Sequence, residues 1–65
     1  MHLKIVTDGQ VRWISNVDET ELDDDDCVEY LKDGNRVFID NPDEAYLINS
    51  QGETIDVLVR AKRVA

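Results

Sequence analysis

The chain has 65 residues and a formal net charge of −8, from 15 acidic and 7 basic side chains. A chain of this length forms one small domain, which buries only about 60% of the surface that it exposes when unfolded. No apolar run approaches the roughly 20 residues of a membrane-spanning helix, and the first apolar stretch is too short for a signal peptide. We therefore expect one small domain over residues 1–65, with no membrane contact.

The usual covalent and metal supports of very small domains are missing from the sequence. Cys27 is the single cysteine, so the chain cannot form an internal disulfide, and no Cys/His set could bind a structural zinc ion. Stability must then come from packing, from dimerisation or from a partner. We expect a reducing, cytoplasmic setting and neither a cofactor nor a dedicated metal site.

Three turns organise the chain in order. Asp-Gly at 8–9 and at 33–34 lies between alternating apolar residues, which is typical of a two-residue hairpin turn, and Gln-Gly at 51–52 is a weaker example. The pattern predicts three hairpins made of six short strands, with no internal sequence repeat. The residues expected opposite one another are Lys4 with Trp13, Val6 with Val11, Val28 with Ile39, Tyr30 with Val37, Tyr46 with Val57 and Ile48 with Ile55.

Two segments also fit a helix. Residues 23–32 begin with acidic side chains and end near a lysine, and residues 42–50 follow an Asn-Pro-Asp-Glu start that resembles a capped helix. The strand interpretation is favoured for both because each continues an alternating apolar pattern. The predicted fold is therefore all-β, a small meander or an SH3-like-sized barrel of about six short strands, with a short helix near 42–50 as the alternative.

The negative charge is concentrated in one segment. Residues 17–33 carry nine acidic side chains against Lys32, whereas the C-terminal end is basic through Arg60, Lys62 and Arg63. Four consecutive aspartates at 23–26 are typical of a solvated loop. An EF-hand loop starting at Asp18 fails, because its sixth position is an aspartate instead of glycine. Nonspecific binding of a divalent cation by residues 23–26 is the weaker alternative.

Catalysis and nucleic-acid binding are both disfavoured. The single histidine, His2, lies beside the terminus, and Cys27 follows four acidic residues that disfavour its thiolate, so we do not expect an enzyme. The few basic residues cannot offset the net charge, so direct nucleic-acid binding is also not expected. Trp13 fits the core of the first sheet, with an exposed binding anchor as the alternative.

The sequence thus favours a non-enzymatic module that binds a basic surface of another protein. In its sharpest version the module inhibits a nucleic-acid-binding protein by mimicking nucleic-acid charge. The alternative is a structural or oligomer-forming protein whose acidity suits a high-salt cytoplasm, and the unpaired strand edges also allow a homodimer. The candidate partner-binding residues are the acidic side chains of the segment and the tryptophan: Asp18, Glu19, Glu21, Asp23, Asp24, Asp25, Asp26, Glu29 and Trp13.

Overall fold

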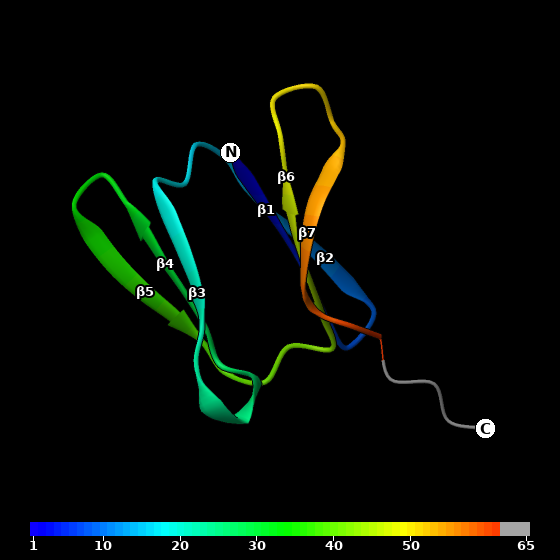
Figure 1. Cartoon of the computed structure of the whole chain (residues 1–65). Helices are drawn as coiled ribbons and strands as arrows, with labels where there is room; N and C mark the ends of the chain where they lie inside the picture. Colours follow the sequence, from blue (N-terminus) through cyan, green and yellow to red (C-terminus); the bar gives the residue numbers. More distant parts are fainter. Residues whose placement is uncertain (62–65) are drawn as a thin grey trace.

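A computed structural model describes residues 1–61 and shows a protein built from β-strands (Figure 1). The basic residues Lys62 and Arg63 lie outside the described residues. A 3₁₀ turn, η1, spans Asp24–Asp26. The strands are β1 (His2–Thr7), β2 (Gln10–Ile14), β3 (Glu19–Leu22), β4 (Val28–Lys32), β5 (Asn35–Ile39), β6 (Glu44–Ile48) and β7 (Thr54–Val59).

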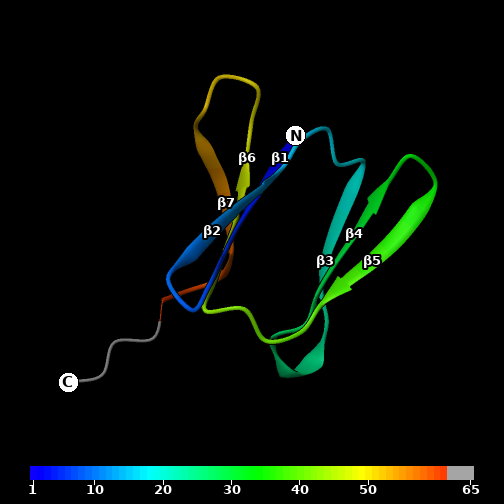
Figure 2. The same ribbon diagram turned by 180° about the vertical axis from the view of Figure 1, so that it is seen from behind.

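The strands form two antiparallel sheets, one of four strands in the order β2-β1-β6-β7 and one of three in the order β3-β4-β5. Figures 1 and 2 show the two sheets side by side, joined by the segments before β3 and before β6. The all-β prediction is confirmed, but the single meander and the closed barrel are wrong. The physical reason is that β6 pairs with β1 instead of β5, which divides the strands between two sheets.

The helix alternative near 42–50 is also wrong, because residues 44–48 form β6. Ala45 and Leu47 of this strand are buried in the core, so their alternation matches a sheet with one buried face. Neighbouring strands on both sides, β1 and β7, pair with its backbone. Of residues 23–32, only 28–32 form a strand, as favoured, whereas residues 24–26 form the 3₁₀ turn. β3 is a strand that the sequence pattern did not predict.

Five of the six predicted pairs of opposite residues are confirmed by the register of the three hairpins. The exception is Ile48, which lies opposite Thr54 instead of Ile55. The register shifts between Leu47 and Ile48, at a β-bulge or similar irregularity, and such a shift moves every later pairing by one position.

The hydrophobic core lies between the inner faces of the two sheets. The four-stranded sheet contributes Leu3, Ile5, Ala45, Leu47 and Val59, and the three-stranded sheet contributes Val28 and Tyr30, with Val17 from the connection. The core is small, so each contact matters more than it would in a larger domain. Within the described residues, no helix is long or apolar enough to cross a membrane.

The structure also shows an internal repeat, which corrects the expectation that there is none. Residues 2–22 fold as β1-β2-β3, and residues 27–47 fold as β4-β5-β6, with equivalent positions 25 residues apart. Asp8, Gly9 and Asn16 have positive φ, and so do their equivalents Asp33, Gly34 and Asn41. The identical pairs are Asp8/Asp33, Gly9/Gly34, Ile14/Ile39, Asn16/Asn41, Asp18/Asp43, Glu19/Glu44 and Leu22/Leu47.

The two repeats exchange their third strands. β3 of the first repeat pairs with β4 of the second, and β6 of the second pairs with β1 of the first. The same hydrogen bonds fix both exchanges: the Asp18 N–H donates to the Leu31 carbonyl at 2.8 Å, and the Asp43 N–H donates to the Val6 carbonyl at 2.9 Å. Each repeat is therefore completed by the other.

The side chains of these two aspartates hold the hairpin turns of the opposite repeat. The Asp43 carboxylate accepts a hydrogen bond from the Asp8 N–H at 2.8 Å, and the Asp18 carboxylate accepts one from the Asp33 N–H at 3.2 Å. The backbone N–H groups of the turn residues Asp8 and Asp33 would otherwise have no protein partner. The carboxylates of Asp43 and Asp18 suit this role because a charged acceptor forms a strong hydrogen bond.

Removing one of these carboxylates should destabilise the whole domain. We expect Asp43→Ala to lower the free energy of unfolding by about 1.5–3 kcal/mol, the usual net value of a hydrogen bond to a charged group. The exposed Asp56 on β7 provides the control, because Asp56→Ala removes the same charge without a turn contact. Urea unfolding of both variants measures the difference, and equal stabilities would contradict the role of Asp43.

Candidate functional site

The acidic segment supplies two strands of the three-stranded sheet, and its four consecutive aspartates lie in the connection between them, as expected. Residues 17–33 include β3, η1 and β4, so most of their backbone is placed by strand pairing. Along β3 and β4 the side chains alternate. Thr20, Leu22, Val28 and Tyr30 belong to the inner face, whereas Glu19, Glu21 and Glu29 belong to the outer face. Three carboxylates of the segment therefore share one surface.

The outer face carries an internal ion pair. Glu21 lies opposite Glu29 on the neighbouring strand, and Glu29 lies opposite Phe38 on β5. The Arg36 guanidinium donates to the Glu29 carboxylate, and the Glu29 residue is only 8% exposed. Burial of a charge requires such a partner, so Glu29 serves the fold more than a binding surface.

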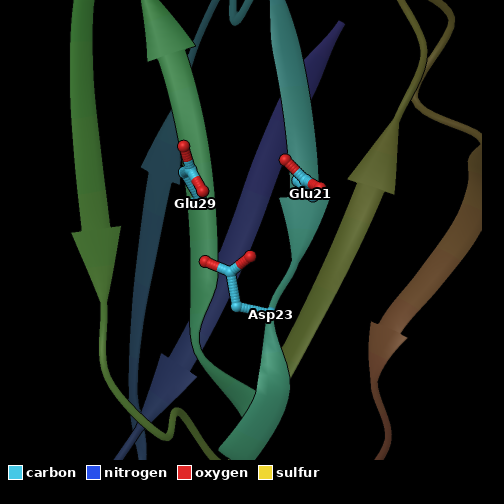
Figure 3. A group of neighbouring side chains, drawn as sticks. All are labelled: Glu21, Asp23 and Glu29. Atoms are coloured by element: carbon cyan, nitrogen blue, oxygen red, sulfur yellow. The ribbon is translucent and has the colours of Figure 1, made fainter.

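The Asp23 carboxyl group completes a compact acidic cluster with Glu21 and Glu29. Each of the three residues offers a ligand atom, and these atoms all lie within 4.8 Å of one another. Figure 3 shows Asp23 directly after β3, with its carboxyl group pointing into the space between Glu21 on β3 and Glu29 on β4. Its half-buried position, hydrogen bonding to Glu29 and the surrounding negative charges raise the pKa of Asp23 above its ordinary value.

Carboxylates are hard ligands, so this cluster is where the described residues could hold a metal ion. It differs from the expected group at 23–26, since it includes Asp23 but not the three aspartates of η1. It supplies few protein ligands for a Ca²⁺ ion, which takes about 6–8 oxygen atoms. Carboxylate geometry alone therefore does not assign a metal to it.

The other predicted acidic residues have different positions. Asp18 is exposed, but its carboxylate holds the second hairpin turn. Asp24, Asp25 and Asp26 form η1 at the end of the sheet, where Asp25 and Asp26 adopt positive φ. Glu19 and Glu21 are exposed on the outer face. They line an open hollow of about 340 Å³ together with Leu31 and Arg36.

Trp13 lies apart from the acidic residues. The residue is 59% exposed, so the expected place in the core is wrong, and the side chain has the exposure that the alternative, a binding anchor, requires. It lies on β2 of the four-stranded sheet, where the Lys4 ammonium group is 5.8 Å from its ring centroid and 5.6 Å from that of Tyr46. The structure therefore does not combine Trp13 and the acidic segment into one surface.

The two residues considered for catalysis are both engaged in the fold. The His2 Nδ1 atom accepts a hydrogen bond from the Asn16 N–H at 3.2 Å. The Cys27 thiol donates to the Asp40 carboxylate at 3.4 Å. Partial burial, this hydrogen bond and the nearby carboxylates raise the pKa of Cys27, which disfavours the thiolate.

Sequence reasoning missed Arg36 as the partner of Glu29, and it missed the exposed edge of β3. The register predicted for β4 and β5 already placed Arg36 on the same face as Glu29. The opposite charges of these two side chains could therefore have indicated their ion pair. The edge of β3 could have been found from the spacing of 25 residues, because Asp18-Glu19 and Leu22 match Asp43-Glu44 and Leu47 of a predicted strand.

Comparison with protein-family models, curated proteins and solved structures found no match to this chain.

The raised pKa of Asp23 predicts that its charge destabilises the fold at neutral pH. A carboxyl group with a folded pKa above its unfolded pKa binds more protons when folded, so stability decreases as the pH rises through this interval. We expect Asp23→Asn to be more stable than the parent chain at pH 7, and the difference to vanish below roughly pH 4. Asp56→Asn controls for net charge, and thermal unfolding across this pH range measures both. A constant difference at all pH values would contradict the prediction.

The environment of Cys27 predicts slow alkylation. We expect iodoacetamide to react more slowly with the folded protein at neutral pH than with the urea-unfolded chain, because the thiolate fraction is lower. Asp40→Asn removes the hydrogen-bonded negative charge and should accelerate the reaction. Mass spectrometry of the modified fraction against time gives the rates, and a folded protein that reacts as fast as the unfolded chain would disprove this account.

Proposed function

We propose that the protein is a non-enzymatic interaction module that binds a basic surface of a protein partner through Glu19, Glu21 and Asp23. The acidic cluster carries this proposal. One oxygen atom from each of its three carboxyl groups lies within 4.8 Å of the others, and within the described residues only Glu29 of these three forms an ion pair, with Arg36. Like charges at this distance cost stability, and a basic partner would relieve that cost.

The position of the charge supports a binding surface that is formed before the partner arrives. Glu19 and Glu21 are exposed and belong to a sheet strand, so their spacing is set by the fold before any encounter. A preformed surface loses less conformational entropy on binding than a flexible acidic loop. Negative charge on one face also steers a positively charged partner and raises its association rate.

An inhibitor that mimics nucleic-acid charge is a special case of this function. In that case the partner's basic surface is itself a groove for DNA or RNA. Addition of double-stranded DNA or RNA would then release the partner, whereas a partner that binds elsewhere would be retained. The exposed Trp13 is not required for this mode, because it lies on the other sheet.

Two double variants with the same change of net charge test the function. Glu19→Gln with Glu21→Gln neutralises the proposed surface, and Asp8→Asn with Asp56→Asn neutralises exposed positions of the four-stranded sheet. Immobilised protein is used to capture partners at rising salt concentration, and the captured proteins are identified by mass spectrometry. We expect the first pair to weaken capture about tenfold and the second pair to leave it nearly unchanged, as for charged contacts worth about 1.4 kcal/mol.

Three outcomes would overturn the function. Both double variants could capture the partners equally, capture could be independent of ionic strength, or the partners could lack a basic surface. If no partner is retained and multimolar salt strongly stabilises every variant, the acidity instead suits a high-salt solvent.

A further inference from the structure

One edge of the three-stranded sheet is free to accept another strand. Within residues 1–61, β3 pairs with β4 alone, so its other edge carries no strand. The Asp23 N–H donates to the Cys27 carbonyl at 2.8 Å, on the side of β4. Because backbone groups alternate along a strand, those of Glu19 and Glu21 also face β4, whereas those of Thr20 and Leu22 face the free edge.

The internal repeat shows that the edge equivalent to this one pairs with another strand. The equivalents of Thr20 and Leu22 in the second repeat are Ala45 and Leu47 of β6, and they lie opposite residues of β7. Leu47 is 8% exposed at this interface, whereas Leu22 is 44% exposed at the free edge. The fold therefore adds an antiparallel strand at one of two equivalent edges and leaves an apolar side chain uncovered at the other.

Charge determines which strand fits. An antiparallel second copy of β3 would bring Glu19 and Glu21 close to the same residues of the first, and like charges on adjacent strands are destabilising. A strand with lysine or arginine on its outer face would instead place cations beside these carboxylates. The same acidic residues thus disfavour self-association at the edge and favour a basic segment.

We propose that the free edge of β3 binds an extended segment of a partner protein in which basic and apolar residues alternate. This inference deepens the proposed function, on which it rests, by naming the partner as a strand that adds to the sheet. The apolar residues lie on the inner face and cover Thr20 and Leu22. The basic residues lie on the outer face, beside Glu19 and Glu21 and the hollow that these residues line.

The hydrogen-bond pattern of this complex is defined by the edge. Thr20 and Leu22 present their N–H and C=O groups, and the residues directly opposite them exchange both hydrogen bonds in an antiparallel pair. Those opposite residues share the inner face, so they are the apolar ones. Methylation of the apolar residues' backbone nitrogens removes these bonds, whereas methylation at the basic residues does not.

Two peptides of equal mass and charge provide the test. Both are short, acetylated and amidated, and alternate Lys with Val; one is N-methylated at the valines and the other at the lysines. We expect the valine-methylated peptide to bind the full-length protein about tenfold more weakly, or worse, because it loses backbone hydrogen bonds. Fluorescence anisotropy of labelled peptides measures the affinities at low and physiological ionic strength.

A protein variant and amide exchange locate the strand. Thr20→Pro removes an N–H that faces the free edge and not β4, a position where edge strands tolerate proline. It should abolish binding of the lysine-methylated peptide, and in the parent chain this peptide should slow hydrogen exchange of the Thr20 and Leu22 amides. The peptide comparison and the exchange measurement do not depend on the folding of the variant.

The outcomes separate this inference from the proposed function. Equal, salt-sensitive binding of both peptides, without protection of Thr20 and Leu22, overturns strand addition but leaves attraction of a basic surface intact. No binding of the lysine-methylated peptide also overturns strand addition, and the capture experiment with the Gln variants then judges the proposed function separately. If the lysine-methylated peptide does not bind and the Gln variants capture partners as well as the parent chain does, both strand addition and the proposed function are overturned.

Discussion

The reciprocal exchange of strands between the two repeats is the constraint on which the rest of the structure depends. Neither repeat has a complete sheet of its own, since β3 and β6 each pair with the first strand of the other repeat. Asp18 and Asp43 hold both exchanges with a backbone and a side-chain hydrogen bond each. A chain with no disulfide and a small core thus obtains long-range order from two equivalent junctions.

This arrangement explains which features the sequence could predict. Hairpin register is local, because an Asp-Gly turn and alternating apolar residues determine which positions lie opposite one another. Five of six predicted pairs were therefore right, and Ile48 failed because an irregularity shifts the register inside β6–β7. The pairing of β1 with β6 joins residues far apart in the chain, and no local pattern indicates it. The expected meander and barrel failed for this reason.

The candidate site shows the same division between local and long-range information. The accumulation of acidic residues in one segment was visible in the sequence, but their environments differ. Glu29 is buried against Arg36, Asp18 holds a turn, and Glu19 and Glu21 remain exposed. Only the placement of strands assigns these different roles. It also separates Trp13 from the acidic surface, because β2 belongs to the other sheet.

Comparison of the two repeats also shows how the outer faces of the two sheets differ. Lys4 and Glu29 occupy equivalent positions on the outer faces, and so do Trp13 and Phe38. Lys4 lies over two aromatic rings, whereas Glu29 joins Glu21 and Asp23. The three equivalent strands of each sheet thus present opposite charge beside an exposed aromatic ring. Since these three strands are arranged alike in both repeats, it is the difference in side chains that limits the proposed binding of a basic partner to the three-stranded sheet.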